Sequence, residues 1–85
     1  VKVADQSGWT VIEEPAAAAI WTFTPAGHPA HPAVVRRGIV QRGNDILVDM
    51  EVKCEAAKPA CDRLAAEFQT LVDQMRQSLN RGRAR

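Results

Sequence analysis

The feature that most constrains this chain is a change of hydrophobic period between residues 45 and 80. From residue 45 to residue 54, apolar side chains occupy every second position and mostly charged side chains lie between them, which is typical of a half-buried β-strand. The apolar positions of this segment are Ile46, Val48, Met50, Val52 and Cys54. From about residue 59 to residue 80 the apolar spacing becomes three and four residues, which indicates an amphipathic helix. A strand followed by such a helix predicts a sheet with one helix packed on a face.

Two further strands are predicted upstream, over residues 17–24 and 33–42. In the first, Trp21 and Phe23 share a face, and we expect that face to point into the core. In the second, the alternation breaks at Arg36-Arg37-Gly38, which indicates a bulge or an exposed edge. Between them, residues 25–32 contain three prolines and predict a rigid loop. Gly43 and Asn44 suit a tight connection to the next strand.

The N-terminal segment is ambiguous, because residues 9–12 fit either a short edge strand or an extended arm. A chain of 85 residues has room for one domain. We therefore expect an α+β domain: a three-stranded antiparallel meander, four-stranded if residues 9–12 join it, packed against one C-terminal helix (βββα) with one disulfide. Residues 1–15 would form the arm or edge strand, residues 16–80 the domain, and residues 81–85 a flexible basic tail.

The two cysteines, Cys54 and Cys61, lie at the end of the last predicted strand and in the first helical turn. A disulfide here would fasten the helix to the sheet, which a small domain needs. The alternatives are two buried free thiols, a zinc site completed by His28 and His31, or a redox pair, although the spacing is longer than in redox motifs. We favour the disulfide, which implies a periplasmic or secreted location.

Two other features bear on location. The sequence has no apolar run of about 18 residues, so no membrane-spanning segment is expected. It begins at Val1 instead of Met, which leaves two explanations open. Either a targeting segment has been removed, or the sequence was shortened for expression.

Candidate binding residues are few. Arg36, Arg37 and Arg42 could form a basic patch that contacts phosphates, but a net charge of +1 makes a nucleic-acid partner unlikely, and arginines also protect sheet edges from aggregation. Trp9 could serve as an aromatic anchor. His28 and His31 belong to the rigid loop, either as an epitope or as solvated histidines. An apolar helix stripe wider than the sheet can cover would favour dimerisation, so we expect a monomer or a weak dimer.

No catalytic pattern stands out. Ser7 and Ser78 lack the flanking glycines of a nucleophile elbow, and the glycines are too scattered to form a phosphate-binding loop. The sequence therefore predicts a non-enzymatic protein without catalytic residues, cofactor or metal, with a structural role or an unknown protein partner. The alternative function is a basic-patch module that binds nucleic acid or another polyanion.

A resemblance supports the predicted location. The stretch from Trp21 to Arg37, with Val52-Lys53-Cys54 and the segment Ala60-Cys61-Asp62-Arg63-Leu64, resembles a group of small conserved hypothetical proteins of Gram-negative bacteria, many of them exported. This resemblance implies an envelope or secreted location and a Cys54–Cys61 pair. It implies no activity and no catalytic residues.

Overall fold

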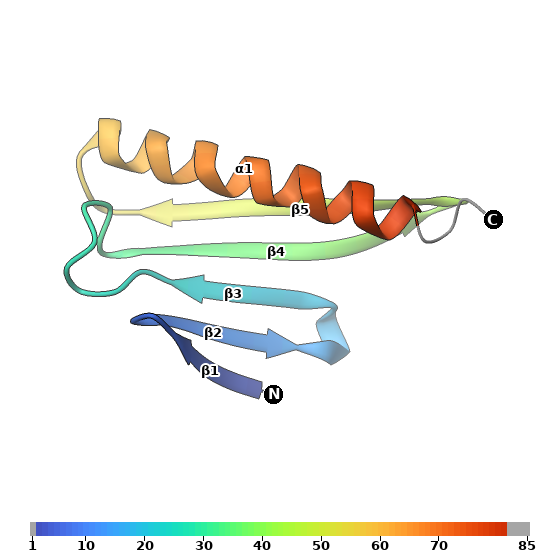
Figure 1. Cartoon of the computed structure of the whole chain (residues 1–85), viewed down its shortest axis with the longest axis horizontal. Helices are drawn as coiled ribbons and strands as arrows, with labels where there is room; N and C mark the ends of the chain where they lie inside the picture. Colours follow the sequence, from blue (N-terminus) through green and yellow to red (C-terminus); the bar gives the residue numbers. More distant parts are fainter. Residues whose placement is uncertain (1, 82–85) are drawn as a thin grey trace.

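The computed structural model describes residues 2–81 and shows one antiparallel sheet followed by one helix (Figure 1). The five strands lie side by side in chain order, so the sheet is a simple meander. The strands are β1 (Lys2–Gln6), β2 (Trp9–Glu14), β3 (Ala19–Phe23), β4 (Ala33–Arg42) and β5 (Asp45–Cys54), and the helix is α1 (Lys58–Arg81). The expected α+β class, antiparallel sheet and single C-terminal helix are confirmed.

The β4–β5 hairpin is the longest part of the sheet. Its register runs without interruption from Ala33 opposite Cys54 to Arg42 opposite Asp45, and Gly43 adopts a positive φ of 58° in the connecting turn. The predicted strands over residues 33–42 and 45–54 are confirmed. The bulge or exposed edge predicted around Arg37 is wrong, because β4 pairs with β3 on one side and β5 on the other.

The strand count predicted from the sequence is wrong, because residues 2–14 form a β-hairpin instead of one strand at most. Gln6 pairs with Trp9 across a two-residue loop whose residues, Ser7 and Gly8, have φ values of 55° and 87°. Two positive φ angles are typical of the type I′ turn, whose twist matches that of the adjoining strands. The Asp5 carboxylate accepts a hydrogen bond of 3.1 Å from the Gly8 N–H and closes the turn. β2 then pairs with β3, which gives five strands.

The helix covers only one side of the sheet, and only half of it. α1 lies along β5 and β4 (Figure 1), and its length of about 36 Å matches the roughly 34 Å of these strands. The core forms where they meet, with Leu64 and Phe68 from the helix and Val35 from β4. Ala30, from the proline-rich loop, is fully buried in the same cluster. The strands β1 to β3 extend beyond the edge of the helix.

The prediction that Trp21 and Phe23 point into the core is also wrong. Thr22, which lies opposite the core residue Val35, is the buried residue of β3 on the side of α1. Because neighbouring residues of a strand face opposite ways, Trp21 and Phe23 lie on the side away from the helix, where Phe23 is 37% exposed.

The end of α1 is fastened to the free edge of β5. The Asn80 side chain accepts a hydrogen bond from the Ile46 N–H (3.0 Å) and donates one to the Ile46 carbonyl oxygen (2.9 Å), so that it pairs with the edge as another strand would. Arg81 ends the helix, and the rest of the predicted basic tail, residues 82–85, lies outside the described residues. In residues 2–81, no helix has the length and apolar character needed to span a bilayer.

Candidate functional site

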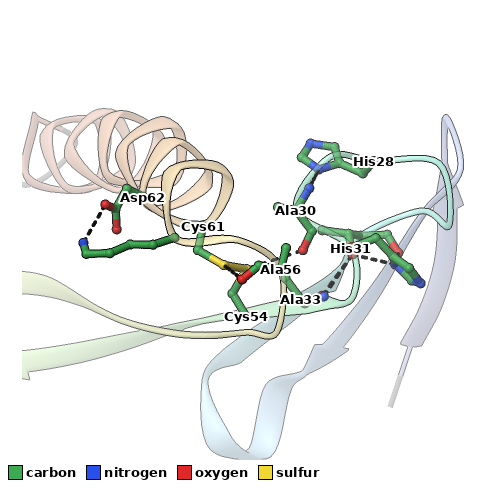
Figure 2. Close-up of a disulfide and its surroundings, with 10 residues drawn as sticks. His28, Ala30, His31, Ala33, Cys54, Ala56, Cys61 and Asp62 are labelled. Atoms are coloured by element: carbon green, nitrogen blue, oxygen red, sulfur yellow. Dashed lines mark hydrogen bonds and ion pairs between the residues drawn. A yellow bond between two sulfur atoms is a disulfide. The ribbon is translucent and has the colours of Figure 1, made fainter.

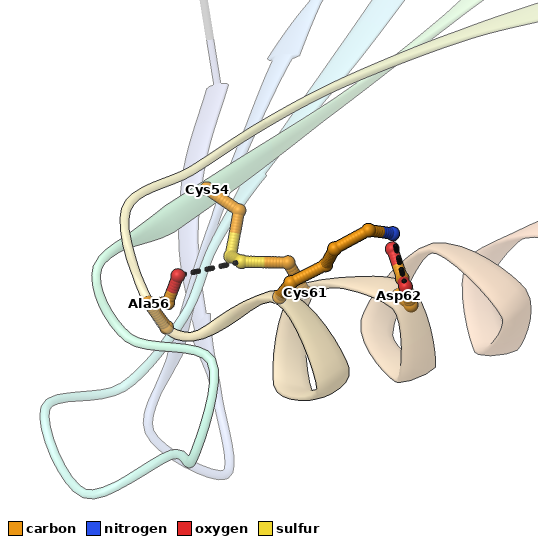
Figure 3. A network of polar contacts seen from close by, with 5 residues as sticks. Cys54, Ala56, Cys61 and Asp62 are labelled. Atoms are coloured by element: carbon orange, nitrogen blue, oxygen red, sulfur yellow. Dashed lines mark hydrogen bonds and ion pairs between the residues drawn. A yellow bond between two sulfur atoms is a disulfide. The ribbon is translucent and has the colours of Figure 1, made fainter.

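The disulfide predicted between Cys54 and Cys61 is confirmed, and it joins the end of β5 to the first turn of α1 (Figure 2). The two Cα atoms are 5.8 Å apart. The sulfur of Cys54 lies 3.4 Å from the Ala30 carbonyl oxygen, and that of Cys61 lies 3.3 Å from the Ala56 carbonyl oxygen (Figure 3). These are contacts and not hydrogen bonds, because a disulfide sulfur has no proton to donate. Since both cysteines are oxidised, neither is a free thiol or a thiolate ligand for zinc.

The loop histidines do not come together. His28 accepts a hydrogen bond at Nδ1 from the Ala30 N–H (3.0 Å), and its ring lies edge-on to Trp9 with 5.0 Å between the centroids. His31 is exposed, and its Nδ1 lies 2.9 Å from the hydroxyl of Thr24. Figure 2 shows the two rings pointing in different directions. Within residues 2–81 there is no group of three or more potential ligands that could hold a metal ion.

The three predicted arginines do not form one patch. Arg36 lies on the side of the sheet away from α1, over the Trp21 ring at 5.6 Å, and 3.8 Å from the Glu51 carboxylate. Arg37, the next residue of β4, points to the opposite side. Arg42 is exposed at the end of the β4–β5 hairpin, six positions from Arg36 and so about 20 Å away along the strand.

The side of the sheet away from α1 mixes apolar and charged side chains. Trp21 donates a hydrogen bond from its indole N–H to Glu14 (3.3 Å), and the Arg36 guanidinium covers its ring. A shallow hollow of about 250 Å³ lies beside it, between Arg36, Glu51 and Lys53. Charged groups therefore cover the largest aromatic ring of this face, as on an ordinary solvated sheet surface.

The other side carries a groove of about 370 Å³, which we call the α1 groove. It lies where α1 stops short of β1 to β3: those strands form its floor, and the flank of the helix forms one wall. Its apolar lining consists of Trp9, Val11, Ile20, Phe68 and Leu71. Leu71 is 42% exposed although it belongs to the apolar stripe of the helix. Trp9 and Phe68 pack together at one end, with 5.8 Å between the ring centroids.

Among the side chains that the structure describes, one cation, Arg37, lines this groove. Its Nη2–H donates to the Thr22 hydroxyl (3.2 Å), Nη1 contacts the Met75 sulfur (3.5 Å), and Cζ lies 5.5 Å from the centre of the Phe68 ring. Its Nε–H is buried without a hydrogen-bond partner. Burial lowers the pKa of the guanidinium from its ordinary value, but an arginine remains charged at physiological pH.

Comparison with models of known protein families, with curated proteins and with solved structures gives no match. The function therefore has to be argued from the geometry of the α1 groove.

The groove contains some residues that sequence analysis selected and others that it missed. It brings Arg37 and Trp9 into contact with the same ring, that of Phe68, while His28 packs against Trp9 from the loop. Val11, Ile20 and the exposed face of Leu71 were missed as site residues. For Leu71 the sequence held a signal, because this residue lies at the margin of the wide apolar stripe of α1, where the sheet does not cover it.

Proposed function

We propose that the protein is a non-enzymatic binding module, periplasmic or secreted, which holds one amphipathic helix of a partner protein in the α1 groove. The observation that carries this proposal is that α1 covers β4 and β5 only. On the same side, β2 and β3 present Trp9, Val11 and Ile20 beside the exposed Leu71. Apolar surface next to a helix flank is the usual arrangement for binding a helix in a groove.

The dimensions support a helix as the bound element. Strands in a sheet lie about 4.8 Å apart, so β1 to β3 span about 10 Å between their outer axes, and packed helices lie 8–10 Å apart. A second helix beside α1 would therefore lie over these strands. Strands of five or six residues extend about 17–20 Å, which is the length of a helix of about 11–13 residues. The floor of the groove fits one helix of about three turns.

A second copy of this chain is a poorer occupant than a different protein. The apolar stripe of α1 packs on its own sheet through Leu64, Phe68 and Val72. The exposed residues Thr70 and Gln77 belong to its outer surface, which is polar. Within the part of the chain that the structure describes, a second copy therefore has no free apolar helix to offer, so the proposed partner is a different protein that supplies one.

The location in this proposal is supported by the disulfide. Oxidised cysteine pairs persist in the periplasm and outside the cell, and they are reduced in most cytosols. The resemblance to small exported bacterial proteins agrees with this location. Nucleic-acid binding receives less support, because Arg36 and Arg37 lie on opposite sides of the sheet.

A selection experiment tests the proposed site. A phage-displayed library of amphipathic helices of about 13 residues, varied on the apolar face, is selected on the oxidised protein. We expect the selected helices to bind the wild type and to lose binding to Leu71→Glu, which places a charge on the groove wall. Val3→Glu is the matched control, because Val3 is also an exposed apolar residue (64%) but lies on the opposite side of the sheet. Helices that bind both variants equally, or no selected helices, would contradict the proposal.

A further inference from the structure

Arg37 has no counter-charge among the residues that the structure describes. The ion pairs between described side chains join Arg36 to Glu51 and Lys58 to Asp62, and neither includes Arg37. Its neighbours across the sheet on the same side are Ile20 and Met50, which are apolar. The nearest acid in this row is Glu13, which also lines the α1 groove but lies two strands away on β2, about 10 Å from Arg37 along the sheet.

The surroundings of Arg37 make this lack of a partner costly. The guanidinium lies between Phe68 and Met75, and part of its hydration is lost there. A half-buried charge without a counter-ion, and a buried Nε–H without an acceptor, both cost free energy in the folded state. The hydroxyl of Thr22, which is a neutral acceptor, and the Phe68 ring beside the guanidinium offset part of this cost, but neither supplies a counter-charge.

The guanidinium lines the α1 groove and has donors that its contacts within the chain leave unused. Nη1 and Nη2 each carry two N–H groups, and the contacts to Met75 and Thr22 use one on each nitrogen. The remaining two can point at the two oxygens of one carboxylate, which is the geometry that arginine favours. A neutral amide in the same place would supply one acceptor and no charge.

We infer that the helix bound in the α1 groove carries an aspartate or glutamate in the middle of its apolar face, and that this carboxylate pairs with Arg37. The inference rests on the function proposed above and names the chemistry of the partner. Apolar residues three and four positions to either side of the acid share its helix face. They would meet the Trp9–Phe68 end of the groove and the Leu71 wall.

The test uses the same helix library, selected in parallel on the wild type and on Arg37→Met. Methionine keeps much of the length of the side chain and removes the charge. We expect Asp and Glu to be enriched at the central apolar-face position on the wild type and not on the variant. A selected peptide and its copy with the acid changed to the amide are then compared by titration calorimetry. On the wild type, the acid form should bind at least about tenfold more tightly than the amide form. On the Arg37→Met protein, the two forms should bind with equal affinity.

Two controls keep the inference separate from the proposed function. Arg36→Met removes the neighbouring charge on the opposite side of the sheet and should preserve the preference for the acid. Arg37→Lys keeps the charge without the paired donors and should retain part of the preference, and it covers the case in which Arg37→Met folds poorly. Binding without a preference for the acid would overturn the inference and leave the proposed groove intact. The absence of any bound helix would overturn both.

Discussion

Removing the disulfide gives the sharpest test of how this fold is held together. The bond joins positions seven apart in the sequence and fastens the first turn of α1 to the end of β5 (Figure 3). Cross-linking two points of a chain reduces the entropy of the unfolded state, and a loop of this size corresponds to about 2.5 kcal/mol. The double substitution Cys54→Ala/Cys61→Ala is therefore expected to lower the free energy of unfolding by about that amount.

The effect should be large in a thermal experiment. In a domain of 60–100 residues, each kcal/mol shifts Tm by about 4–8 °C, so the double variant should melt about 10–20 °C below the wild type. Circular dichroism at 222 nm follows α1 directly. Wild-type protein kept in reductant has the same side chains without the cross-link, and its Tm should fall to that of the double variant.

The comparison also identifies the cause. If the reduced wild type and the double variant melt together, the loss comes from the cross-link and not from the removed sulfur atoms. A Tm within about 3 °C of the oxidised wild type for both samples would refute this reasoning, because α1 would then be held by the Leu64–Phe68 core and by Asn80 alone.

Three further substitutions probe other contacts. Leu64→Ala, at a side chain that is 1% exposed, should cost about 2–5 kcal/mol in chemical denaturation, because it opens a cavity under the helix. Asn80→Ala should cost about 1–2 kcal/mol and speed hydrogen exchange at the Ile46 amide, which loses its acceptor. The hydrogen bond and charge of Asp62 raise the pKa of Lys58 above its ordinary value of 10.5, so Asp62→Asn should lower that pKa in an NMR titration. Since the folded-state pKa is the raised one, any stabilisation by this exposed pair is present at neutral pH and is lost as the pH rises through the folded-state pKa of Lys58.

The C-terminal half of the fold can be predicted from the sequence because each of its elements has a clear period. The strand over residues 45–54 and the helix after residue 59 each bury one side and expose the other. Apolar residues therefore recur at the period of each element, and the sequence pattern matches the packing. The corner between them is equally predictable, since Cys54 ends the strand and Cys61 lies one turn into the helix.

The N-terminal hairpin is not predictable in the same way. β2 carries apolar residues on both of its sides, Val11 on one and Ile12 on the other, so no period of two stands out. β1 is short and polar. The turn was the available signal, but Ser7-Gly8 takes the place of the Asn-Gly or Asp-Gly pair that usually marks a type I′ turn.

The orientation of β3 shows where pattern reasoning reaches its limit. Aromatic residues usually indicate the buried side of a strand, which is why Trp21 and Phe23 were expected in the core. Which side is buried depends on where the helix lies, and α1 lies over β4 and β5 instead of β3. The small, buried Thr22 then faces the side of α1, where it leaves room for Arg37.

That placement also explains why Arg37 is more informative than its arginine neighbour. Arg36 stacks on Trp21 and approaches Glu51, so its charge is balanced within the chain. Arg37 contacts only uncharged groups: the Thr22 hydroxyl, the Met75 sulfur and the Phe68 ring. Its buried Nε–H has no hydrogen-bond partner among the described residues. A methionine at this position would fill the same space beside Phe68 without the cost of desolvating a charge. A carboxylate arriving in the α1 groove would supply the missing counter-charge, and the pairing would contribute to binding energy and selectivity.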